Sequence, residues 1–114
     1  MSAEVAALLQ DIGTCARLIM QYTTGLTQEE FSRSIQTQDA VLRRIEIIGE
    51  AVKSLPSEFT LAHPDIPWRD MARMRDLLIH RYFSVDLELT WKTATEDVPG
   101  LERQVHEVLD SLSE

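Results

Sequence analysis

The sequence predicts an all-α protein, an up-and-down helical bundle of four to five helices that forms a single domain over residues 1–114. Three observations predict this fold class. The chain has only four glycines, and its four prolines are grouped around two boundaries. Apolar residues recur at steps of three and four, the spacing of one face of an α-helix. At 114 residues, the chain can build one hydrophobic core but has little room for a second.

The first long helix is predicted over residues 3–23. Ser2 is the expected N-cap, Glu4 falls in the first turn, and Gly25 is the expected stop. Its apolar face is formed by Val5, Leu8, Leu9, Ile12, Ala16, Ile19 and Met20. Thr27 is then followed three residues later by a glutamate, which predicts a capping box and a short helix.

The only cysteine, Cys15, lies within the apolar pattern of the first helix. A packed thiol is therefore a better interpretation than a nucleophile. A single cysteine also excludes an internal disulfide and is typical of a reducing compartment, so we expect a cytoplasmic protein.

The second long helix is predicted from about residue 34 to residue 54, with Pro56 after its end. Gly49, inside this helix, predicts close approach by another helix, because glycine is otherwise unfavourable there. Glu46 and Glu50 share one face, a poor arrangement unless a basic group lies opposite, and solvated charges are the more frequent explanation. The core face is formed by Val41, Ile45, Ile48, Val52 and Leu55.

A short helical turn is expected over residues 57–62, with Phe59 and Leu61 buried. Residues 63–68 form a rigid connector, in which Pro67 fits the first position of the next helix. The third long helix follows, and its apolar positions are Met71, Met74, Leu77, Leu78 and Ile79. An apolar arc this broad predicts contact on two sides, one with the core and one with another subunit.

Asp86 is the expected cap of the last helix, whose apolar stripe continues to Leu112. Pro99 and Gly100 should kink or interrupt this helix, which makes it one bent helix or two. His106 falls among polar residues on the outer face and is expected to be solvated.

The net charge of −8 argues against general electrostatic attraction to nucleic acid. A nucleic-acid site would depend on one basic patch, formed by Arg69, Arg73, Arg75 and Arg81. No apolar run approaches the roughly 20 residues of a membrane span. One cysteine and three scattered histidines offer no metal-ligand spacing, so no metal site is expected.

The stretch from Arg75 to Tyr82 holds a guanidinium, an imidazole and a phenol in a chain with only three histidines and two tyrosines. Asp76 and His80 are four residues apart, so the carboxylate can orient the ring. Arg75 and His80 diverge by roughly 140° on an ideal helix. They can act together only if the helix loosens at its end or a second copy of the chain supplies the partner group. A solvated helix end, where the helix dipole favours basic residues, explains the spacing equally well.

Four ordered blocks carry a family resemblance. Arg75-x4-His80-x-Tyr82 matches the signature of HEPN-type ribonucleases, and residues 44–56, 63–69 and 82–87 resemble the HepT-like branch in the same order. The likeness is close over residues 35–112 and holds only in pattern for the first helix. The asparagine that often follows the signature arginine is an aspartate in this chain.

The resemblance implies a HEPN-like bundle and a metal-independent RNA endonuclease without a cofactor. Such an enzyme is the toxin of a toxin–antitoxin pair and works as a homodimer. His80 would be the general acid or base, and Arg75 would hold the phosphate and stabilise the transition state. Asp76 would orient either of them, and Arg73 and Arg81 would contact RNA. Attack by the 2′-hydroxyl would leave a 2′,3′-cyclic phosphate and a 5′-hydroxyl, and tRNA is one candidate substrate.

The resemblance also implies a partner, a nucleotidyltransferase antitoxin of the MntA type. It would add AMP to the signature tyrosine, which is Tyr82 in this chain (AMPylation). Two other readings stay open. The chain is also consistent with a non-catalytic module that presents nucleotide or substrate to a nucleotidyltransferase, which the acidic composition favours. The other alternative is a plain helical dimerisation domain, which leaves the Arg-His-Tyr cluster unexplained.

Overall fold

The computed structural model describes residues 2–80 and 86–112, and residues 78–80 are described by their backbone alone. The elements, in chain order, are α1 (Ala3–Thr23), α2 (Gln28–Arg33), α3 (Ile35–Ser54), α4 (Ser57–Ala62), α5 (Trp68–His80), α6 (Leu87–Lys92), the π-helical turn η1 (Thr93–Asp97) and α7 (Val98–Leu112). No strand occurs among the described residues, which confirms the predicted all-α class.

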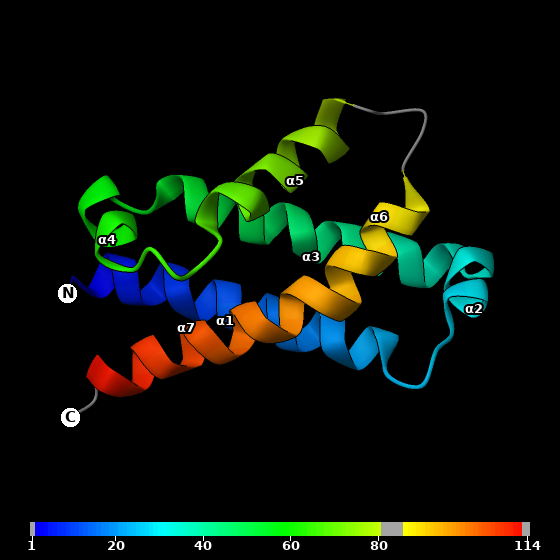
Figure 1. The fold of residues 1–114 in the computed structure, drawn as a ribbon, viewed down its shortest axis with the longest axis horizontal. Helices are drawn as coiled ribbons and strands as arrows, with labels where there is room; N and C mark the ends of the chain where they lie inside the picture. The colour runs from blue at the N-terminus through cyan, green and yellow to red at the C-terminus, as the bar shows by residue number, and fades with distance from the viewer. Residues whose placement is uncertain (1, 81–85, 113–114) are drawn as a thin grey trace.

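The long helices run up and down the bundle (Figure 1). Helix α1 runs away from the end at which the chain begins, α3 returns, α5 runs outward again, and α6 to α7 lead back. Helix α1 packs against both α3 and α7, whereas the main packing partner of α5 is α3. Helix α5, which carries the signature, therefore lies at the edge of the bundle.

The core is formed by apolar side chains of α1, α3 and α7, joined by a few from the shorter helices. The apolar faces predicted for the first two long helices supply about half of the buried apolar residues. Its largest fully buried apolar side chains are Leu9, Ile12, Ile19, Phe31, Val41, Ile45, Ile48, Met71, Val98, Leu101 and Val105. Cys15 is buried and free among them, as a packed thiol should be.

The predicted helix starts in the first third of the chain are confirmed by their hydrogen bonds. The Ser2 side chain accepts a bond from the Val5 amide at 3.2 Å. The Glu30 amide donates to the Thr27 hydroxyl at 3.1 Å, and the Thr27 amide donates to the Glu30 carboxylate at 3.0 Å, completing the capping box. Gly25, just after α1, has φ of +78°, a conformation that favours glycine.

The predicted interruption near Pro99 is a single π-helical turn, η1, which precedes the proline. In a regular α-helix the proline ring would collide with the carbonyl group of Thr95, four residues earlier. The wider π-helical turn relieves this conflict, and the helix continues through Pro99 as α7. Asp86 caps α6 as predicted, because its carboxylate accepts a bond from the Leu89 amide at 2.9 Å. His106, on α7, is exposed as predicted.

One burial prediction is wrong. Leu61 was expected inside, but its side chain is 78% exposed. Residues two apart on a helix point about 200° away from each other, so α4 can turn only one of Phe59 and Leu61 inward. Phe59 faces inward, with its ring centroid 4.6 Å from that of His63 and 5.9 Å from that of Trp68.

Helix α5 begins one residue later than the proline position suggested. The Pro67 carbonyl accepts the first helical bond, from the Met71 amide at 3.2 Å, so Pro67 precedes Trp68 rather than opening the helix. Met71 and Met74 are buried as predicted. The predicted burial of Leu78 and widening of the arc by Ile79 concern side chains outside the described part of the structure. Within residues 2–80 and 86–112, no helix has the length and apolar character needed to cross a membrane.

Candidate active site

Helices α3 and α5 touch at Gly49. A Cβ atom built on Gly49 would lie 2.1 Å from Cβ and 2.7 Å from Cγ of Arg75, and 3.3 Å from the Met71 carbonyl oxygen. Real Cβ contacts are not this short, so only glycine allows the two backbones to approach this closely. The prediction that another helix approaches this glycine is confirmed, and the residue that it meets is the signature arginine.

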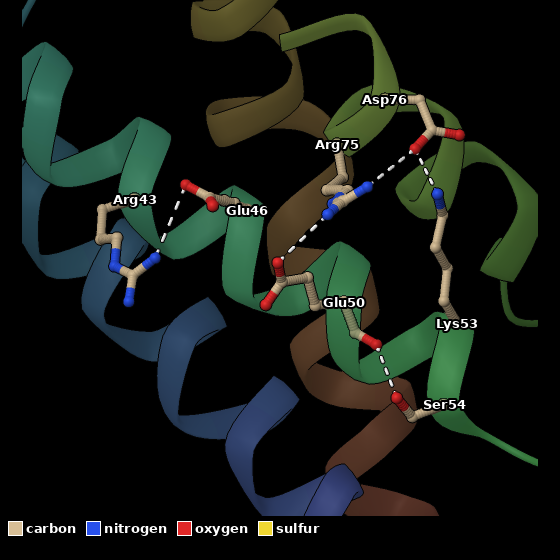
Figure 2. A network of polar contacts seen from close by, with 7 residues as sticks. All are labelled: Arg43, Glu46, Glu50, Lys53, Ser54, Arg75 and Asp76. Carbon is tan, nitrogen blue, oxygen red and sulfur yellow. Dashed lines mark hydrogen bonds and ion pairs between the residues drawn. The ribbon is translucent and has the colours of Figure 1, made fainter. Parts of the chain in front are cut away.

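The Arg75 guanidinium is held by two carboxylates (Figure 2). Its Nη2 donates to Glu50 Oε1 at 3.1 Å, across the contact between α5 and α3. Its Nη1 donates to Asp76 Oδ1 at 3.3 Å, on the same helix. The Nε atom is buried and has no hydrogen-bond partner among the described residues. The side chain is 23% exposed, so the arginine is largely enclosed and keeps one edge open.

Lys53, one turn after Glu50 on α3, completes the cluster by bonding to Asp76 Oδ1. This contact, and then the bond from Arg75, lowers the pKa of Asp76 against the opposing effect of burial. The bond to Glu50, followed by that to Asp76, raises the pKa of Arg75 further above its ordinary value. Two cations and two carboxylates therefore alternate along one helix contact with no net charge.

The two glutamates of α3 have different partners. Glu50 faces Arg75, the basic group that the sequence required for a favourable arrangement. Glu46 pairs at 3.6 Å with Arg43 on its own helix. Sequence reasoning missed Lys53. A signal was present, because Lys53 lies four residues after Gly49 and three after Glu50, so it shares a side of α3 with each of them.

The structure brings only some of the predicted site residues together. Arg75 and Asp76 are in contact, and Arg73 is exposed on the same helix. His80 is the last residue of α5, and its side chain is outside the described structure. Arg81 and Tyr82 also lie outside the described residues. The orientation of His80 by Asp76 and the addition of AMP to Tyr82 thus stay predictions.

The described residues contain no cluster of three or more histidine, cysteine or acidic side chains arranged to hold a metal ion. An open groove of about 710 Å³ borders the cluster, and it is lined by Lys53, Trp68 and Arg69 among others. Most of the residues that line this groove are apolar, and its charged residues are Lys53, Arg69 and Asp70.

Comparison with known proteins identifies the class. The family model described as "Ribonuclease HepT-like" matches residues 12–108. The chain is 52% identical over 93 residues to a probable ribonuclease HepT of Thermococcus cleftensis, covering 82% of this chain and 84% of that protein. It is 39% identical over 109 residues to a putative RNase of Methanocaldococcus jannaschii, covering 96% of this chain and 90% of the relative.

A third relative, also from Methanocaldococcus jannaschii, is a gamma-glutamylcyclotransferase and putative RNase. It is 45% identical over 112 residues, which are 98% of this chain but 50% of that protein. No solved structure shows a significant match to the chain. The all-α fold, the signature on α5 and these matches define a ribonuclease class. Within it, the chain belongs to the HepT-like ribonuclease family.

Proposed function

We propose that this protein is a metal-independent endoribonuclease and that Arg75 is the group that binds the scissile phosphate. One observation carries the proposal. The signature arginine is held by carboxylates of two helices at the edge of the bundle, and Lys53 of the same cluster also lines an open groove. A guanidinium held in place in this way suits a phosphate, because it binds two oxygens with fixed geometry.

The reaction follows from the chemistry of RNA. A general base removes the proton of the 2′-hydroxyl, O2′ attacks phosphorus, and the bond from phosphorus to O5′ breaks. A general acid protonates O5′, which leaves a 2′,3′-cyclic phosphate and a 5′-hydroxyl. His80 has the side chain suited to these proton transfers near neutral pH. Arg75 stabilises the charge that develops on the non-bridging oxygens.

The proposal includes a homodimer. Helix α5 is helical as far as His80, so positions 75 and 80 lie about 140° apart around its axis. One copy therefore cannot easily direct both groups at one phosphate, and a second copy can supply the missing group. The position of α5 at the edge of the bundle supports such pairing.

We further propose that the enzyme acts in the cytoplasm, as a single domain, as the toxin of a HepT/MntA-type pair. Its partner would be an MntA-like nucleotidyltransferase that adds AMP to Tyr82. A bulky anion at this position would repel the substrate phosphate and obstruct the site. Membership of the HepT-like family supports this assignment.

Incubation of the purified protein with total RNA in EDTA tests the proposal. Cleavage with 2′,3′-cyclic phosphate ends is expected. His80→Ala should lower the rate by at least about 100-fold, the effect of losing a general acid–base group, and Arg75→Ala should lower it by about as much, the effect of losing a group that stabilises transition-state charge. Both variants should keep their helical circular dichroism signal. Intact RNA with the wild-type protein would instead favour the non-catalytic module. Full activity in either variant would exclude the assigned site.

A further inference from the structure

We propose that Glu50 is a positioning residue for Arg75 in RNA cleavage. This inference rests on the proposed function and adds a residue from outside the signature helix. It also assigns a role to a glutamate whose purpose the sequence left open.

The first step concerns the position of the Arg75 backbone, from which the side chain starts. At Gly49, α3 and α5 are so close that no Cβ fits between the backbone of α3 and the first two carbons of the Arg75 side chain. The Cα of Arg75 thus has a set distance from α3. The remaining freedom of the side chain lies in the orientation of its guanidinium group.

The second step is the restraint on that group. Glu50, the residue next to Gly49, accepts a hydrogen bond from Nη2 at 3.1 Å. Asp76 accepts from Nη1 at 3.3 Å, but the same oxygen also accepts a bond from Lys53. Glu50 is therefore the carboxylate that holds Arg75 from the facing helix, whereas Asp76 is shared between two cations.

The third step concerns the hydrogens that remain. Each terminal nitrogen of a guanidinium carries two hydrogens, and here each gives one to a carboxylate. One hydrogen on each nitrogen is left to donate to phosphate oxygens. The carboxylates thus orient the guanidinium without consuming its capacity to bind a phosphate.

The experiment separates the rate constant of cleavage from RNA affinity. Single-turnover cleavage at saturating RNA gives the rate constant, and binding of the same RNA with a 2′-deoxy group at the cut site gives affinity. For Glu50→Ala, we expect the rate constant to fall by about 10- to 100-fold, the effect of a small misplacement of a catalytic group, with little change in affinity. Glu50→Gln keeps a hydrogen-bond acceptor and should recover most of the rate.

Two further variants keep the test informative. Glu50→Met retains the length of the side chain without the carboxylate and should show the same loss, should Glu50→Ala fail to fold. Glu46→Ala is the matched control, since Glu46 lies one turn earlier on α3 and pairs within that helix. It should cleave at the wild-type rate.

The outcomes are distinguishable. If the wild type cleaves, His80→Ala does not, and Glu50→Ala matches the wild type, the positioning role is excluded while the proposed function stands. If Glu50→Ala binds RNA more tightly and cleaves faster, Glu50 competes with phosphate, which also overturns the role. A wild type that leaves RNA intact overturns the proposed function and this inference together.

Discussion

At the scale of single residues, the most informative group is Asp76, because its charge ties the candidate site to folding stability. Its pKa is lowered, first by the hydrogen bond from Lys53 and also by that from Arg75. A carboxyl group with a lowered folded-state pKa stabilises the fold above its unfolded pKa, which is about 3.9. That stabilisation is lost as the pH falls through the lowered value.

The corresponding prediction uses Asp76→Asn. At neutral pH, urea denaturation should show a smaller free energy of unfolding for this variant than for the wild type. The difference should hold from pH 7 to about pH 4. It should shrink below that, because the carboxyl group is protonated first in the unfolded state and then, at the lowered pKa, in the folded state. Lys53→Met should remove much of the same pH dependence. If the difference in the free energy of unfolding stayed constant down to pH 2, the stabilising role of the Asp76 charge would be contradicted.

At the scale of elements, the contact between α3 and α5 decides where the arginine lies, and Gly49 sets the contact distance. Alanine has a higher helix propensity than glycine by about 1 kcal/mol. At this position, however, the added Cβ would meet Arg75 Cβ at 2.1 Å, which requires the helices to separate. Overpacking of this kind destabilises by about 1–3 kcal/mol and so outweighs the gain in propensity.

Gly49→Ala should therefore lower the free energy of unfolding by up to about 2 kcal/mol, the overpacking cost less the propensity gain. It should also slow RNA cleavage. The matched control is Gly13→Ala in α1, where an added Cβ would meet only Arg17 and Val105, at 3.5 and 3.7 Å. These are ordinary contacts, so this variant should be as stable as the wild type or more stable. Chemical denaturation of both variants checks the prediction. It would be contradicted if Gly49→Ala raised the free energy of unfolding as much as Gly13→Ala does.

The elements themselves were largely predictable because their signals are local. The capping box at Thr27, the cap at Asp86 and the apolar periods act within one helix. Gly49 predicted the presence of a helix contact, because glycine inside a helix needs a reason. Leu61 was misjudged because α4 is too short for an apolar pattern to define its inward face.

The pairing of Glu50 and Lys53 with the signature residues could not be predicted in the same way. It depends on which helix packs against α3 and at what crossing angle, and both are properties of tertiary packing. Spacing showed that the charges of α3 share a face, but not what lies opposite. The signature identified Arg75 and Asp76 as site residues from α5 alone, so it gave no information about their partners on α3.

At the scale of the whole molecule, the predicted homodimer determines whether the site is complete. Helix α5 has its main packing partner on one side only, and Leu77 on this helix is only partly buried. We expect sedimentation velocity at micromolar concentration to show a dimer. Leu77→Glu should shift it toward monomer and reduce cleavage, because burial of a charge in an apolar interface is unfavourable.

The control for this prediction is Ile35→Glu, at an apolar position at the start of α3 that is 72% exposed. It should leave both the dimer and the cleavage rate unchanged. A wild-type monomer with full activity would exclude a site that needs two copies.

The up-and-down path places the start of α1 and the end of α7 at one end of the bundle, while α5 leads away toward the other (Figure 1). Extra sequence joined at either terminus therefore grows away from the signature end of α5. One relative, of which this chain spans half, combines two activities in its name. For laboratory work, immobilisation through either terminus should therefore keep the support away from the end of α5 that carries Arg75 and His80.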